Sequence, residues 1–62
     1  IERVLRERLS RDTATRDVQV AVADETKGLS ACFIVSATAA TDPHAAIARL
    51  MAPFAIAWRI EP

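Results

Sequence analysis

The chain has 62 residues, of which 52% are hydrophobic, and its eight basic and eight acidic side chains cancel at pH 7. A polypeptide of this length forms one small domain or part of one, and its apolar content excludes a disordered tail. The balanced charge gives no overall reason to expect nucleic acid or a membrane as a partner, and the apolar runs are too short to span a bilayer. One cysteine excludes an internal disulfide, and a free thiol in an apolar run favours a cytoplasmic location.

The first segment, IERVLRERLS (1–10), has the hydrophobic spacing of a helix, with Ile1, Val4, Leu5 and Leu9 on one face. Opposite charges four residues apart are expected to pair on its outer surface: Glu2 with Arg6, and Arg3 with Glu7. The polar stretch SRDTATRD (10–17) reads as a connection without large apolar side chains.

A hairpin is predicted next. Val18, Val20 and Val22 alternate with smaller or polar side chains, which is the period of a strand. The stretch DETKG makes the turn, and Gly28 can take the positive φ that a loop of three to five residues often needs. The return strand is expected over residues 29–37. Because both of its faces are fairly apolar, it should be central in the sheet and covered on at least one side.

A second helix and a third strand complete the chain. Asp42 is the expected N-cap of the helix, Pro43 its first residue, and Pro53 its end. Its buried stripe is expected to contain Ile47, Leu50 and Met51. The third strand is expected to alternate large residues with small or charged ones, the large ones being Phe54, Ile56, Trp58 and Ile60. Residues 1–62 are thus predicted to form a single small α+β domain, a three-stranded sheet with two packed helices in the order helix-strand-strand-helix-strand.

Few residues suggest chemistry. His44, in the first turn of the second helix, suits a metal or acid–base role, but no second ligand set accompanies it, and an exposed helix start is the favoured interpretation. Cys32 has no basic neighbour in the sequence to activate its thiol, so core packing is favoured. Trp58 suits a ligand stack or an interface, and core or docking surface is favoured. We therefore assign no catalytic, cofactor-binding or metal-ligating residue, and the segment is not a self-sufficient enzyme.

Basic residues concentrate in the first quarter, which suggests a phosphate or nucleic-acid surface; they are Arg3, Arg6, Arg8, Arg11 and Arg16. Acidic residues interleave with them, so a solvated charged face is favoured. A single glycine beside Lys27 does not make a phosphate loop.

The order of the segments resembles the small C-terminal domain of adenylate-forming ligases, the acyl-CoA synthetases, aryl-acid ligases and adenylation domains. The matching positions are Ile1, Glu2 and Leu5 in the first helix, Val20, Ala21 and Val22 in the first strand, Asp24 and Gly28 at the turn, Ala31, Phe33, Ile34 and Val35 in the second strand, Pro53 after the second helix, and Pro62. The similarity covers nearly the whole chain through loose motifs of common residues. The connection before the first strand is longer than that family's.

The resemblance implies that the segment is the body of a mobile lid in an enzyme that activates an acid as acyl-AMP and transfers it to a thiol. The implied partners are a larger N-terminal adenylation domain and either CoA or a carrier protein, with ATP and Mg used by the parent enzyme and no cofactor held by this segment. The glycine-rich hinge would precede Ile1, and the catalytic lysine would follow Pro62.

Two alternatives remain open. The cytoplasmic C-terminal domain of cation diffusion facilitator transporters has the same element order and often ends in a Glu-Pro pair, as in WRIEP here. Its metal-binding histidines are represented only by His44, and Trp58 or Arg59 stands where another is expected. The second alternative is a stand-alone interaction module of ferredoxin-like type.

Overall fold

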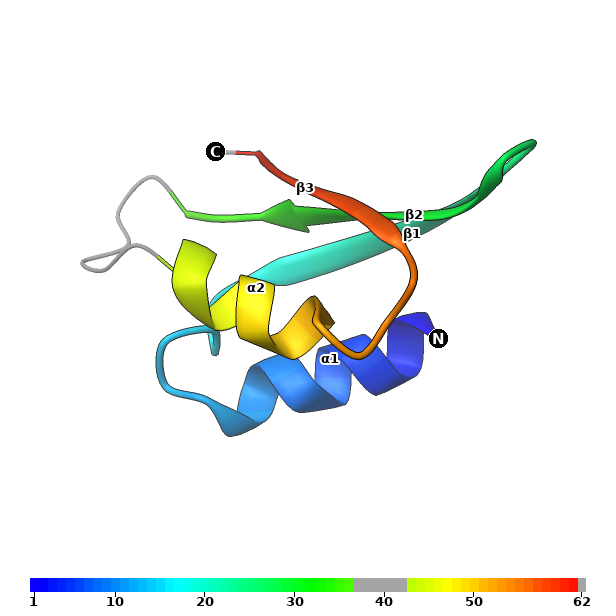
Figure 1. The fold of residues 1–62 in the computed structure, drawn as a ribbon. Coiled ribbons are helices and arrows are strands. Elements are labelled where there is room, and N and C mark those ends of the chain that lie inside the picture. The colour runs from blue at the N-terminus through cyan, green and yellow to red at the C-terminus, as the bar shows by residue number, and fades with distance from the viewer. Residues whose placement is uncertain (37–42, 62) are drawn as a thin grey trace.

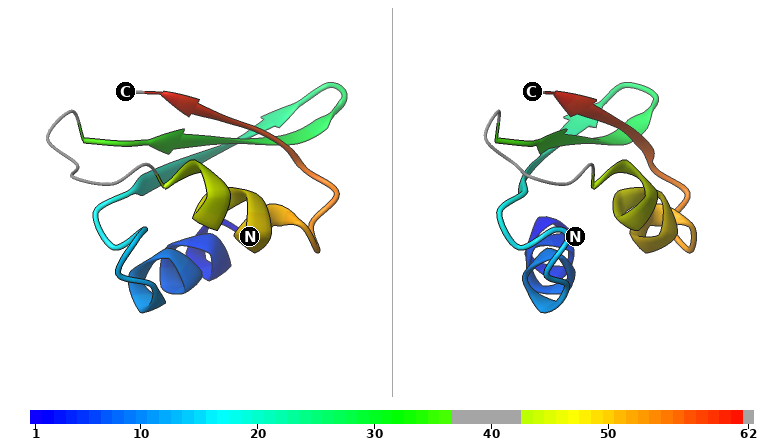
Figure 2. Two further views of the ribbon diagram at one scale, coloured as in Figure 1. Left: turned by 60° about the vertical axis from the view of Figure 1, so that its left-hand side comes forward. Right: turned by 90° about the vertical axis from the view of Figure 1, so that its left-hand side faces the viewer.

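The structure is a computed structural model that describes residues 1–36 and 43–61. Its elements are helix α1 (Glu2–Arg11), strands β1 (Gln19–Glu25) and β2 (Gly28–Ile34), helix α2 (His44–Met51) and strand β3 (Ala57–Glu61). This is the predicted α+β order. Both helices lie on the same side of the sheet, so the molecule has one helical layer and one sheet layer (Figures 1 and 2).

The strands are arranged in the order β1-β2-β3, which confirms that the return strand of the hairpin is central. β1 and β2 are antiparallel, with Val20 opposite Phe33, and β2 and β3 are parallel, with Ile60 opposite Phe33. A parallel pair needs a crossover connection because the chain must return to the same end of the sheet. The segment containing α2 makes that return across the face that α1 also covers.

The core lies between the sheet and the helical layer. Its buried hydrophobic residues are Leu5, Leu9, Val20, Ala31, Phe33, Ile47 and Met51. Trp58 packs against this cluster, and its ring meets that of Phe33 edge to face, with centroids 6.1 Å apart. Aromatic pairs prefer this geometry because the positive edge of one ring faces the negative face of the other. Trp58 is therefore a half-buried side chain at the border of the core, in agreement with the expected core or docking surface.

Only part of the expected apolar face of α1 is buried. Leu5 and Leu9, one turn apart, enter the core, whereas Ile1 is 45% exposed and Val4 42% exposed. The sheet meets α1 along a narrow stripe, and the other two side chains lie beside it. The surface pairing also differs in part: Glu2 pairs with Arg6 as predicted, but Glu7 pairs with Arg11, at 2.7 Å, and not with Arg3.

The hairpin turn is tighter than predicted, because only Thr26 and Lys27 separate the paired Glu25 and Gly28. Gly28 has a φ of 118°, and no other described residue has a positive φ, so the chain reverses at the position expected. A side chain is rarely tolerated at such a φ, even though the space around this glycine is open.

Differences between predicted and observed element boundaries include the end of β2, the start of β3 and the start of α2. β2 ends at Ile34 and not at residue 37, which lies outside the described residues. β3 begins at Ala57 and not at residue 54, because the N–H of Phe54 donates to the carbonyl of Met51 and forms a turn instead of a strand. Pro43 is the N-cap of α2 and not its first helical residue, while Asp42, the predicted cap, lies outside the described residues.

The connection after α1 contains a buried polar side chain that its sequence does not reveal. Thr15 is 1% exposed, and its hydroxyl donates to the carbonyl of Leu9 at 2.8 Å and, at 3.4 Å, to that of Asp12. The last four carbonyls of a helix have no partner within it, so this hydroxyl satisfies one of them. Within the described part of the chain, no helix is both long enough and apolar enough to cross a bilayer.

Candidate functional site

The face of the sheet opposite the helices carries no other element of the described chain (Figure 1). Strand residues alternate between faces, so the neighbours of buried residues point to this bare face. In the register of the sheet they form three rows: Gln19, Ile34 and Glu61; Ala21, Cys32 and Arg59; Ala23, Ser30 and Ala57. Most of these side chains are short, and Ile34 is 39% exposed. The bare face is thus a shallow, mostly small-residue surface with charges toward one edge.

Cys32 lies in the middle row of the bare face and is a half-buried free thiol. The expectation that it packs in the core is wrong, because the helices cover only the face that its neighbours Ala31 and Phe33 occupy. Its neighbour across the strands is Arg59, whose Nε donates to Glu61 at 3.1 Å. The hydrogen bond and charge of Glu61, and secondarily the adjacent Cys32 sulfur, raise the pKa of the Arg59 guanidinium above its ordinary value.

A second feature lies in the helical layer. A surface hollow of about 360 Å³ opens between α1, the connection that follows it, and α2. The residues lining it are Arg8, Arg11, Asp12, Thr15, Ala46, Arg49 and Leu50. Two helices that are distant in sequence therefore direct three arginines to one place. Since the basic residues of the first quarter are all exposed, the expected solvated face is present, but two of them also border this hollow.

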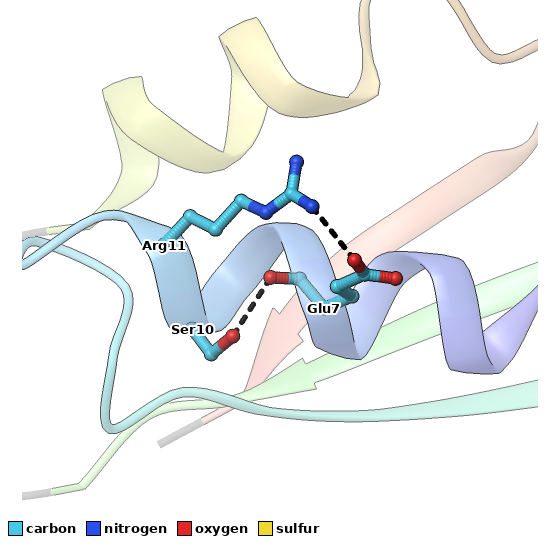
Figure 3. A network of polar contacts seen from close by, with 3 residues as sticks. All are labelled: Glu7, Ser10 and Arg11. Atoms are coloured by element: carbon cyan, nitrogen blue, oxygen red, sulfur yellow. Dashed lines mark hydrogen bonds and ion pairs between the residues drawn. The ribbon is translucent and has the colours of Figure 1, made fainter.

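The three arginines are held differently. The Arg8 guanidinium lies over the ring of Phe54, 5.4 Å from its centroid, which is a cation–π contact between α1 and the segment after α2. Figure 3 shows Arg11 with its guanidinium turned toward the Glu7 carboxylate and the Ser10 hydroxyl donating to the Glu7 carbonyl. Arg49 forms no ion pair with any residue of 1–36 or 43–61. Sequence reasoning missed Arg49 because nothing in its local pattern links it to the first helix.

The other residues singled out by sequence lie apart from the hollow. His44 is exposed at the start of α2, with its ring 5.7 Å from that of Trp58. Lys27 lies at the exposed hairpin tip. No group of three or more histidine, cysteine, aspartate or glutamate side chains in residues 1–36 and 43–61 is placed to hold a metal ion.

Comparison with protein-family models, with characterised proteins and with solved structures finds no match to this chain.

Proposed function

We propose that this chain is the body of the mobile C-terminal lid of an ATP-dependent adenylate-forming ligase. The observation that supports the proposal is the order and pairing of its elements: a helix, an antiparallel hairpin, a crossover helix and a third strand parallel to the second. The resemblance in sequence implies the same order of segments along nearly the whole chain. Two residues that match the family's motifs, Leu5 and Phe33, are also buried in the core, as residues that maintain the fold would be.

The bare face of the sheet supports a role that needs a larger neighbour. A small sheet is stable when its apolar surface is covered, and here only one face is covered by the chain's own helices. Short side chains such as Ala21 and Ala23 permit close approach of another surface, and Ile34 offers an apolar contact there. In this proposal the larger N-terminal adenylation domain contacts the bare face in at least one position of the lid.

The resemblance to the ligase family implies how the tasks are divided in the proposed enzyme. ATP, Mg and the acid are held by the larger domain, and CoA or a carrier protein supplies the thiol. This segment maintains the sheet and the surfaces that dock. Rotation of such a lid between two positions is a hinge motion, and hinge motions of this kind gate turnover in many enzymes.

The first experiment reads the coding sequence on both sides of this segment and assays the longer protein. We expect a glycine-rich hinge before Ile1, a glycine–lysine pair soon after Pro62, and acid-dependent exchange of pyrophosphate into ATP. Flanking membrane helices, or the absence of exchange with every carboxylic acid class tried, would contradict the ligase proposal.

A matched pair of variants tests the role of the bare face in that longer protein. Ala21→Glu places a carboxylate on the bare face, and Ala45→Glu makes the same change at an exposed position of α2. We expect Ala21→Glu to slow thiol transfer or exchange at unchanged melting temperature, and Ala45→Glu to leave both unchanged. Equal activities of the two variants would show that the bare face does not dock.

Two further outcomes would favour the alternatives. A rise of several degrees in melting temperature with stoichiometric zinc would favour the transporter domain, because a ligand that binds only the folded state stabilises it. A stable dimer of the 62-residue chain in sedimentation would favour a stand-alone interaction module. A monomer with no response to zinc agrees with the lid.

A further inference from the structure

We infer that the hollow between α1 and α2 is a binding site for the phosphate group of a small soluble phosphate ester. The inference does not rest on the ligase proposal, because it concerns only side chains of this chain. Its basis is the convergence of Arg8, Arg11 and Arg49, from two helices, on one surface depression.

The local charge of the hollow differs from the net charge of the protein. The whole chain has a formal net charge of zero. The three arginines and Asp12 leave the lining side chains of the hollow with a formal charge of +2, that is, three positive groups and one negative. Glu7, which pairs with Arg11 beside the hollow, reduces the local excess to +1. The hollow is therefore a positive site on a neutral protein, and an anion entering it meets attraction from two elements at once.

The guanidinium groups retain donors for a ligand. Glu7 engages Arg11 through one nitrogen, and a guanidinium carries five N–H donors. Arg8 lies over the Phe54 ring and forms no ion pair with any of the described residues. Arg49 has no ion pair among the described residues. By contrast, the Thr15 hydroxyl is committed to the carbonyl of Leu9, so Thr15 forms the wall of the hollow and not a ligand contact.

The chemistry of the lining selects phosphate over other anions. Guanidinium groups match the geometry of phosphate oxygens with paired hydrogen bonds. The attraction to the arginines and the repulsion by Asp12 both scale with the charge of the ligand, so the net positive charge of the hollow attracts a phosphate dianion about twice as strongly as a carboxylate monoanion. A volume of about 360 Å³ lies at the lower end of the range for small-molecule sites, which suits a small ester and not a membrane surface.

The test is an NMR titration of the 62-residue chain with inorganic phosphate at constant ionic strength, with acetate as the comparison anion. We expect amide shifts confined to the residues around the hollow and a dissociation constant on the order of 5 mM, as three exposed charge pairs of ordinary strength would produce. Arg49→Gln should weaken binding about fivefold, which is the loss of one such pair. The matched control is Arg3→Gln, since Arg3 is an exposed arginine of α1 that does not line the hollow.

Each outcome decides the matter. Localised shifts with phosphate, smaller ones with acetate, and weakening by Arg49→Gln but not by Arg3→Gln would support the site. Equal effects of the two variants would mean that phosphate senses only the general charge of the protein, and would overturn it. The absence of localised shifts in well-folded wild-type protein would also overturn it. Vesicles containing phosphatidylglycerol form a separate arm, and binding to these vesicles without binding of free phosphate would assign the surface to a lipid headgroup instead.

Discussion

The Thr15 hydroxyl offers the sharpest test of how this small domain is stabilised. Thr15→Val keeps the shape of the side chain and removes its hydrogen bond to the Leu9 carbonyl at 2.8 Å, at a residue that is 1% exposed. Leaving a buried acceptor without its donor costs about 1–3 kcal/mol. A core of this size supplies a net stability of only about 3–5 kcal/mol, so the loss is a large fraction of the total.

Thr15→Ser separates the hydrogen bond from packing, because serine keeps the hydroxyl and removes only a methyl group, worth about 0.8 kcal/mol. We expect the melting temperature to fall by about 4–8 °C for each kcal/mol lost, with Val lower than Ser. Thr13→Val, in the exposed part of the same connection, should change the stability by less than about 0.5 kcal/mol. Thermal and urea unfolding followed by Trp58 fluorescence measure all three variants. If Thr15→Val were as stable as the wild type, or more stable than Thr15→Ser, the hydroxyl would not anchor the end of α1.

Three other substitutions test separate parts of the structure. The Ile47 side chain is fully buried, so Ile47→Ala should lower the free energy of unfolding by about 2–5 kcal/mol and leave the chain largely unfolded by circular dichroism. Ile47→Val should lower it by only about 0.5–1.5 kcal/mol. Equal losses of stability in the two variants would refute the place of Ile47 in the core. Gly28→Ala should lower the free energy of unfolding in urea by about 1–3 kcal/mol, because alanine is strained at a φ of 118° although the space around it is open. Lys27→Ala should leave the free energy of unfolding almost unchanged. An unchanged stability of Gly28→Ala would mean that the turn adopts another backbone conformation without cost. Glu2→Ala removes the acceptor of the Val22 N–H and should speed hydrogen exchange of that amide about tenfold, whereas Glu2→Gln should keep most of the protection.

The hydrophobic periodicity of the sequence predicted most of the fold. The alternation of valines before the turn and of large residues around Trp58 identified strands, and the spacing of Leu5 and Leu9 identified α1, because apolar side chains recur at the period of the element that buries them. A lone glycine at the end of the polar stretch DETKG located the reversal of the hairpin. The ends of the elements were less predictable, since the turn at Phe54 depends on a single backbone hydrogen bond that no pattern announces.

The features of the candidate functional surfaces depend on how the elements pack together, so the sequence predicted them less well than it predicted the elements. Cys32 and Phe33 both stand in an apolar strand, and only the placement of both helices on one face decides that one is half-exposed and the other buried. Arg49 joins Arg8 and Arg11 through the arrangement of two helices, which local sequence does not encode. Thr15 looked like an ordinary loop residue, and its burial follows from the path the chain takes around the end of α1.

The carboxylate of Glu2 has a mechanical consequence. It accepts the N–H of Val22 on β1 at 3.1 Å and also contacts Arg6 at 3.3 Å, so one side chain ties the first turn of α1 to an edge strand twenty residues away. A pull or twist applied at Ile1 is therefore passed to β1 through this hydrogen bond as well as through the packed face of α1. The domain would then rotate as a rigid body about any hinge at its N-terminus. Loss of this hydrogen bond would loosen the start of α1 before it affected the core.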